Sequence, residues 1–149
     1  MKPTCAAAPT GFTLIETVIV LSLMGMLVYL GTSSFLSLIP KYKLESAMWD
    51  IRSTLNAARY RAVFENASVR VRIGGGQWEM EKYDAERKAW VSCRKRSVDG
   101  VRVEANNTPL FTAQGTVGGL ATITITNAWG TYKITLAISG RIKTVRVDQ

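Results

Sequence analysis

The residues of this sequence that could do chemistry are few, because it contains no histidine and only two cysteines, Cys5 and Cys93. Histidine is the commonest general base and metal ligand, and two cysteines cannot form the usual four-ligand zinc site. Glu79 and Glu81 alternate along a predicted strand with basic residues nearby, which indicates a solvated face. The sequence therefore predicts a protein that is not an enzyme and holds no metal or cofactor.

The N-terminal part of the sequence contains a candidate cleavage site directly before an uncharged block. Residues 1–11 (MKPTCAAAPTG) are polar or small, and the character changes abruptly at Phe12. Residues 17–39 carry no charge at all. A secretory signal places its cleavage site after its apolar core, whereas the only plausible site here, after Gly11, comes before it. Cleavage after Gly11 would leave the apolar segment on the mature protein.

The uncharged block predicts a membrane span, because about 20 apolar residues cross a bilayer as a helix. Glu16 is the one charge near its start, and a carboxylate at the edge of a span is costly unless it is paired or at headgroup level. Two interpretations stay open. Glu16 stabilises the first helical turn electrostatically at the headgroup level, or it pairs with a cation on another subunit, such as the N-terminal amine that cleavage creates.

Residues 11–16 (GFTLIE), followed by an uncharged helix, resemble the type III signal of type IV pilins and type II secretion pseudopilins. The resemblance implies that a prepilin peptidase cuts after Gly11, that Phe12 becomes a methylated N-terminus, and that Glu16 pairs with a neighbour's amine during assembly. It also implies the partners: the peptidase, inner-membrane lipid, and other pilins through the N-terminal helix. The location it implies is the inner membrane, crossed once, with a periplasmic head that later enters a filament.

One departure from the family concerns the middle of the span. Many major pilins have a proline about two-thirds of the way along it, whereas here Gly25, Gly31 and Ser33-Ser34 occupy that region and Pro40 follows. A kink or melted stretch is therefore expected at residues 31–34 or at Pro40.

The pattern after Pro40 predicts a second helical segment, residues 41–65. Six apolar residues recur at spacings of three and four, which is typical of an amphipathic helix with one buried stripe: Leu44, Met48, Ile51, Leu55, Ala58 and Ala62. The predicted organisation is a leader (1–11), a transmembrane and assembly helix (12–39), and a pilin-like head (40–149).

From Ala67 onward the apolar residues alternate with polar ones, which predicts strands. The predicted ranges are 69–73, 77–83, 89–94, 101–104, 110–112, 120–126, 131–138 and 141–147. A helix packed on antiparallel sheets is an α+β fold. Leu110-Phe111, Gly115-Thr116 and Ser139-Gly140-Arg141 resemble the minor pseudopilin H/FimT group, which implies a structural subunit that primes or caps a secretion pseudopilus or a pilus.

The charge of the head supports an alternative function. The chain carries a formal charge of +8, most of it after residue 65, and Gly140-Arg141-Ile142-Lys143 partly matches the Gly-Arg-x-Arg signature of FimT-type pilins that bind DNA for uptake. Arg141 and Lys143 would share one strand face with Arg146 on the other, and such groups bind phosphate without reading bases. The competing interpretation is a turn at Gly140 with solvated charges.

A second basic group, Arg94-Lys95-Arg96, follows Trp90 and Cys93. Basic residues beside an aromatic ring can bind a nucleic-acid strand, but Trp90 in a core or interface beside a wet loop is the favoured interpretation. Cys93 is expected to be a lone thiol.

Overall fold

The structure is a computed structural model that describes residues 11–147, and the chain divides into two compact units between Leu38 and Ile39. One helix, α1 (Leu14–Phe64), contributes to both units. It runs without interruption through residues 31–34 and through Pro40, so neither place carries the melted stretch that the sequence suggested. The predicted leader, apart from Gly11, lies outside the described residues, as does Cys5.

The first unit holds the apolar part of α1, Leu14–Thr32, which is long and apolar enough to cross a membrane. None of the residues in this segment is buried within the structure. Apolar side chains surround the helix on all sides here, as they do in a helix that needs an apolar solvent or neighbours from other chains.

In the second unit, α1 buries one stripe of side chains, as the spacing predicts. All six predicted positions are buried, and Ala47 joins them. The helix ends at Phe64 in a Schellman motif. Asn66 takes a positive φ of 46°, its N–H donates to the Val63 carbonyl at 3.4 Å, and the Ala67 N–H donates to the Ala62 carbonyl at 3.1 Å.

Within residues 11–147, eight strands follow the helix, one at each predicted place. They are β1 (Val69–Gly74), β2 (Gln77–Asp84), β3 (Ala89–Ser97), β4 (Arg102–Ala105), β5 (Leu110–Phe111), β6 (Thr122–Asn127), β7 (Gly130–Leu136) and β8 (Ile142–Val147). They form two four-stranded sheets of order β3-β2-β1-β5 and β4-β6-β7-β8, and every pairing is antiparallel. The α+β prediction is confirmed.

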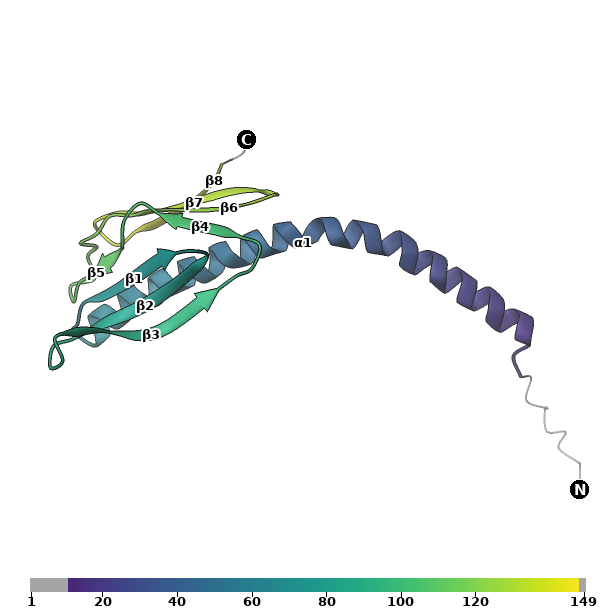
Figure 1. Cartoon of the computed structure of the whole chain (residues 1–149), viewed down its shortest axis with the longest axis horizontal. Helices are drawn as coiled ribbons and strands as arrows, with labels where there is room; N and C mark the ends of the chain where they lie inside the picture. The colour runs from purple at the N-terminus through teal and green to yellow at the C-terminus, as the bar shows by residue number, and fades with distance from the viewer. Residues whose placement is uncertain (1–10, 148–149) are drawn as a thin grey trace, which may run out of the picture. The chain divides into compact units, whose positions relative to one another are not determined.

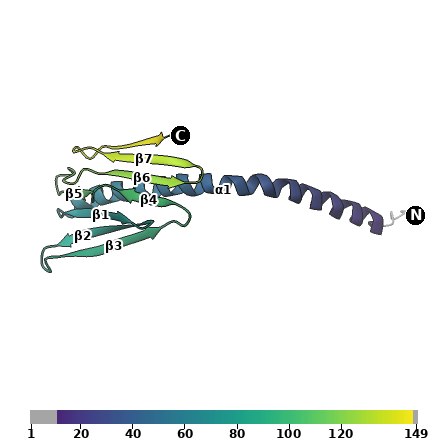
Figure 2. The ribbon, with the colours of Figure 1, turned by 45° about the horizontal axis from the view of Figure 1, so that its top comes forward.

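The two sheets lie side by side along the second half of α1, as Figures 1 and 2 show, and β1 and β4 are neighbours where they meet. Each sheet turns one apolar face to the helix. The first contributes Val69, Val71, Trp78, Met80 and Phe111 to the core, and the second contributes Val103, Ile123, Ile125, Ile134 and Leu136.

The outer face of the first sheet corrects the prediction of a solvated face at Glu79 and Glu81. The exposed fraction of Glu81 is only 6%, because Arg70 and Arg72 on the neighbouring strand both form ion pairs with it. Arg72 also pairs with Glu79 at 3.1 Å. The pKa of Glu79 is lowered by a hydrogen bond from Ser92 and by the Arg72 guanidinium.

Candidate processing and assembly site

The predicted cleavage point lies in the short segment before α1. Gly11 and Phe12 are exposed and non-helical, and 80% of the Phe12 surface is accessible. The helix begins directly after Thr13, whose hydroxyl oxygen accepts a hydrogen bond from the Glu16 backbone N–H at 3.3 Å. Thr13 with Glu16 three residues later has the spacing of a capping box, which fixes where a helix starts. The sequence therefore places an accessible peptide bond immediately before a defined helix start.

The serine and threonine hydroxyls of the apolar segment are bonded within the helix itself. Thr17 donates to the Leu14 carbonyl at 2.7 Å, Ser22 to the Val18 carbonyl at 2.8 Å, and Thr32 to the Val28 carbonyl at 2.7 Å. Each bond reaches back three or four residues, a local pattern common for serine and threonine in helices. These side chains therefore place no unmet polar demand on an apolar environment.

Glu16 is the exception in this segment. It is the one charged residue between Gly11 and Pro40, its side chain is exposed, and it lies in the first turn of α1. Within residues 11–147 its carboxylate makes no ion pair. It lies near the positive end of the helix dipole, where a negative side chain is favourable, but it has no cation from the described part of its own chain.

The three predicted DNA-binding residues do not lie together. Lys143 opposes Thr135 on the outer face of the second sheet, whereas Arg146 opposes Tyr132 on the face turned towards α1. Arg141 is exposed just before β8 begins. The register thus agrees with the expectation that Arg146 points away from Lys143. Lys133 on β7 is exposed on the outer face with Lys143, and it is a residue that the sequence did not single out.

Gly140, the first residue of the predicted signature, has a structural reason to be glycine. Its φ is +79°, and an added Cβ would lie 2.7 Å from the Arg59 guanidinium. That guanidinium joins two loops, because it donates to the Gly115 carbonyl at 3.0 Å and to the Ser139 carbonyl at 3.1 Å. The turn interpretation of Gly140 therefore explains this residue without any ligand.

The second predicted basic group is also held in the fold. Trp90 stacks against Arg70, whose guanidinium carbon lies 4.2 Å from the ring centre, and meets Tyr83 edge-on at 5.3 Å. Arg96 approaches Asp50 of α1 at 3.9 Å. Cys93 is the extra residue of a bulge in β3, since its neighbours Ser92 and Arg94 oppose the consecutive residues Glu81 and Met80. Among the described residues its thiol has no disulfide partner.

A cluster that the sequence analysis missed lies beside Arg146. The Trp129 ring is contacted by the Arg146 guanidinium, 3.8 Å from the ring centre, and by the Lys41 amine at 5.4 Å. The sequence pattern placed Trp129 only between the predicted strands 120–126 and 131–138, with no role of its own. The three residues come from α1, the β6–β7 turn and β8, so only the sheet order brings them together.

One ion-paired carboxylate connects the end of α1 to the first sheet. Glu65 accepts from Lys82 on β2 and from the Arg61 guanidinium, the latter at 2.6 Å. The hydrogen bond from Lys82 has the larger effect and that from Arg61 the smaller, and together they hold the pKa of Glu65 below its usual value. Glu65 and Glu16 thus lie near opposite ends of one helix, the first with two cationic partners and the second without one in the described chain.

Comparison with known proteins identifies the class to which a chain with these elements belongs. Residues 47–148 match the family of the type II transport protein GspH. The match covers more than half of the sequence, and the chain belongs to the GspH family of pilin-like proteins. No curated protein matches it.

Two solved structures of the minor pseudopilin EpsH from the type 2 secretion system of Vibrio cholerae share the fold. One is 14% identical with a TM-score of 0.58, over 68% of this chain and 94% of that one. The other is 12% identical with a TM-score of 0.62, over 74% of this chain and 98% of that one. At such identities the likeness concerns the fold, and it agrees with the predicted pilin-like architecture.

Proposed function

We propose that this protein is a minor pseudopilin, a structural subunit that helps prime or cap the pseudopilus of a type II secretion system. Membership of the GspH family supports this function, as does the likeness of the fold to EpsH. The observation that carries the proposal is Glu16, a carboxylate without an ion pair in the described chain, in an apolar segment whose serine and threonine hydroxyls are internally bonded. Such a group calls for a cation from outside.

The proposed maturation starts in the inner membrane, with the head in the periplasm. A prepilin peptidase cuts between Gly11 and Phe12, and the new amine of Phe12 is methylated. The exposed, non-helical backbone at this point supports access by the peptidase. The Glu16 carboxylate then pairs with the N-terminal amine of a neighbouring subunit, which compensates both charges in an apolar filament interior.

Mass spectrometry of the mature N-terminus, after co-expression with a prepilin peptidase, tests the maturation. We expect a chain that begins at methylated Phe12, and we expect Gly11→Leu to abolish cleavage while Thr10→Ser leaves it intact. A mature chain that keeps Met1, or one cut far from Gly11, would contradict the proposal.

The role of Glu16 can be separated from helix capping by comparing three variants. Glutamine serves as well as glutamate at this position of a capping box, so Glu16→Gln removes the charge and keeps the cap. Thr13→Ala removes the cap and keeps the charge. We expect Glu16→Gln to insert into membranes but to lose cross-linking to neighbouring pseudopilins, whereas Thr13→Ala and the charge-preserving Glu16→Asp retain most of it. Equal loss in Thr13→Ala and Glu16→Gln would assign the effect to helix capping.

Binding of DNA is a second candidate function, favoured by the exposed cations at Arg141, Lys143 and Lys133, the last two of which share the outer sheet face. Three phosphate contacts predict a slope of log K against log salt of about −2.7. The test is duplex binding by the full chain in detergent across salt concentrations. We expect Arg141→Gln with Lys143→Gln to flatten the slope and Arg146→Gln to leave it nearly unchanged. Equal binding by the double variant and the natural protein would reject this site.

A further inference from the structure

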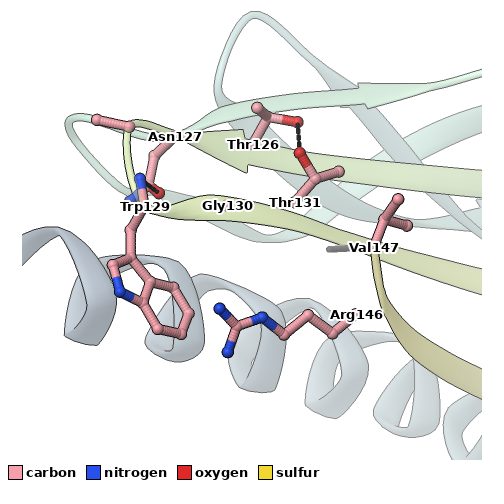
Figure 3. A pocket seen from close by; sticks show the side chains of 8 residues that line it. Thr126, Asn127, Trp129, Gly130, Thr131, Arg146 and Val147 are labelled. Carbon is pink, nitrogen blue, oxygen red and sulfur yellow. Dashed lines mark hydrogen bonds between the residues drawn. The ribbon is translucent and has the colours of Figure 1, made fainter. Parts of the chain in front are cut away.

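The cluster of Lys41, Trp129 and Arg146, called here the Trp129 cluster, is not explained by the proposed assembly through the N-terminal helix. Figure 3 shows the indole and the Arg146 guanidinium next to each other, in front of the helix. The two cations approach the ring to 3.8 Å and 5.4 Å from its centre. Cations on an aromatic ring keep their charge while the ring shields one side of them from water.

The turn that carries Trp129 is fixed to the start of the head helix. Asn127 donates from its side-chain amide to the Pro40 carbonyl at 2.6 Å, and its side-chain oxygen accepts from the Trp129 backbone N–H at 2.8 Å. The flanking hydroxyls of Thr126 and Thr131 lie 3.2 Å apart. These bonds fix the turn that carries Trp129 to the helix segment that carries Lys41.

A cavity of about 230 Å³ lies against the cluster. Its lining includes Trp129 and Arg146, together with Thr126, Asn127 and Thr131. In Figure 3 these side chains come from the β6–β7 hairpin and from β8. The two threonine hydroxyls bond to each other on the face of the sheet opposite Arg146, and the Asn127 amide donates to Pro40. Arg146 is therefore the group that this site offers to an oxyanion, and charge-assisted hydrogen bonds from a guanidinium to a phosphate are among the stronger ones.

The position of Lys41 in the chain ties this cluster to the apolar segment. Lys41 is the first charged residue after the uncharged block and follows Thr32, the end of the apolar segment, by nine residues. Whatever conformation those residues take, they span at most about 30 Å. Tryptophan, lysine and arginine are the residue types that favour the headgroup region of a membrane. A head tethered so closely to a bilayer meets lipid phosphates before it meets any other polyanion.

We propose that the Trp129 cluster binds the phosphate groups of anionic lipid headgroups and holds the head against the membrane before the subunit enters a filament. This inference rests on the membrane anchoring in the proposed function. Arg146 and Lys41 supply the charge, Trp129 inserts its ring among the headgroups, and the cavity accepts the phosphate. Losing one cation near an anionic surface weakens attraction roughly fivefold.

Hydrogen exchange of the full chain in lipid nanodiscs tests the proposal. Discs of phosphatidylcholine alone are compared with discs that contain equal amounts of phosphatidylglycerol. We expect slower exchange of residues 126–131 and 142–147 in the anionic discs, and unchanged exchange of β1 and β2, which also reports that the head is folded.

The matched variants remove the same charge from two places. Lys41→Gln with Arg146→Gln is expected to abolish the difference between the discs, whereas Arg141→Gln with Lys143→Gln keeps it. Lys41→Gln alone leaves the Arg146–Trp129 stack in place and is expected to reduce the protection severalfold.

Four outcomes would overturn the proposal. Equal exchange in both discs, with the chain inserted, overturns this inference alone. If both double variants lost the difference in exchange between the discs equally, the head would be attracted to the anionic discs by its net charge and not by the cluster. Protection of these residues by duplex DNA and not by anionic lipid would assign the cluster to nucleic acid. A chain that does not insert into the discs overturns the membrane anchoring of the proposed function, and this inference with it.

Discussion

The two halves of α1 share one secondary structure but present their apolar side chains in opposite ways. From Leu14 to Thr32 the side chains are apolar around the whole helix and none is buried in the structure. From Leu44 to Ala62 a single stripe is buried against the sheets, and the opposite side carries exposed residues. The comparison teaches that the distribution of apolar residues, and not helix propensity, determines whether a helix finds its partners inside or outside its own chain.

The largest expected effect separates the two halves by a matched pair of leucines. Leu55 is fully buried, whereas Leu21 is 67% exposed. We expect Leu55→Ala to lower the unfolding free energy of the head by about 2–5 kcal/mol, through lost burial and the cavity left behind, and Leu21→Ala to leave it unchanged. The measurement is urea unfolding of the detergent-solubilised chain, followed by near-UV circular dichroism. A comparable loss in Leu21→Ala would show that the two halves are not independent.

A pair of glycines, one in each half of the comparison, is expected to have an intermediate effect on the stability of the head. Gly140 in the head needs a positive φ and meets Arg59, whereas nothing lies within 4 Å of a Cβ built on Gly25 in the apolar segment. Gly140→Ala is expected to destabilise the head by roughly 2 kcal/mol, because a left-handed conformation is strained with a side chain. Gly25→Ala is expected to leave the unfolding midpoint of the head where it is and to favour the helix slightly. A neutral Gly140→Ala would mean that the loop shifts away from Arg59.

The smallest expected effect compares the two carboxylates near the ends of α1. The pKa of Glu65 is lowered in the folded head by Lys82 and Arg61. Its contribution to stability is therefore present above the unfolded-state pKa, near 4.5, and is lost as the pH falls through the lower folded-state value. Ion pairs of this kind contribute about 0.2–1 kcal/mol.

Unfolding of the head between pH 7 and pH 3 measures this contribution. We expect Glu65→Gln to be less stable at pH 7 and to lose less stability on acidification than the natural protein. Glu16→Gln is the control, with an unchanged pH dependence of head unfolding. Parallel pH profiles for the natural protein and Glu65→Gln would contradict the assignment.

Much of the fold could be predicted from local patterns in the sequence. The spacing from Leu44 to Ala62 indicates the buried stripe, and alternation such as that of Val69-Arg70-Val71 indicates strands, because both patterns follow from the geometry of one element. The melted stretch that the sequence suggested at residues 31–34 or at Pro40 did not occur. The helical residues on either side continue the helix through both places, although an interior proline costs about 3 kcal/mol.

The parts that sequence could not supply depend on contacts between distant segments. The alternating pattern of the sequence predicts that Glu81 is solvated. Only the pairing of β2 with β1 shows the two arginines that cover it. The Trp129 cluster needs Lys41, a hairpin turn and the end of β8 to meet, which the sheet order decides. The roles of Gly11, Phe12 and Glu16 remain predictions, since their proposed partners are other molecules.

The internally bonded hydroxyls of Thr17, Ser22 and Thr32 have a consequence for movement between environments. A helix whose serine and threonine hydroxyls bond to its own carbonyls can pass from lipid to the packed interior of an assembly without exchanging those hydrogen bonds. Most of its surface is then nearly indifferent to the transfer, since lipid tails and apolar side chains are similar solvents. In the proposed assembly, Glu16 is the charged group that distinguishes the two environments, so its carboxylate gives the proposed transfer its direction.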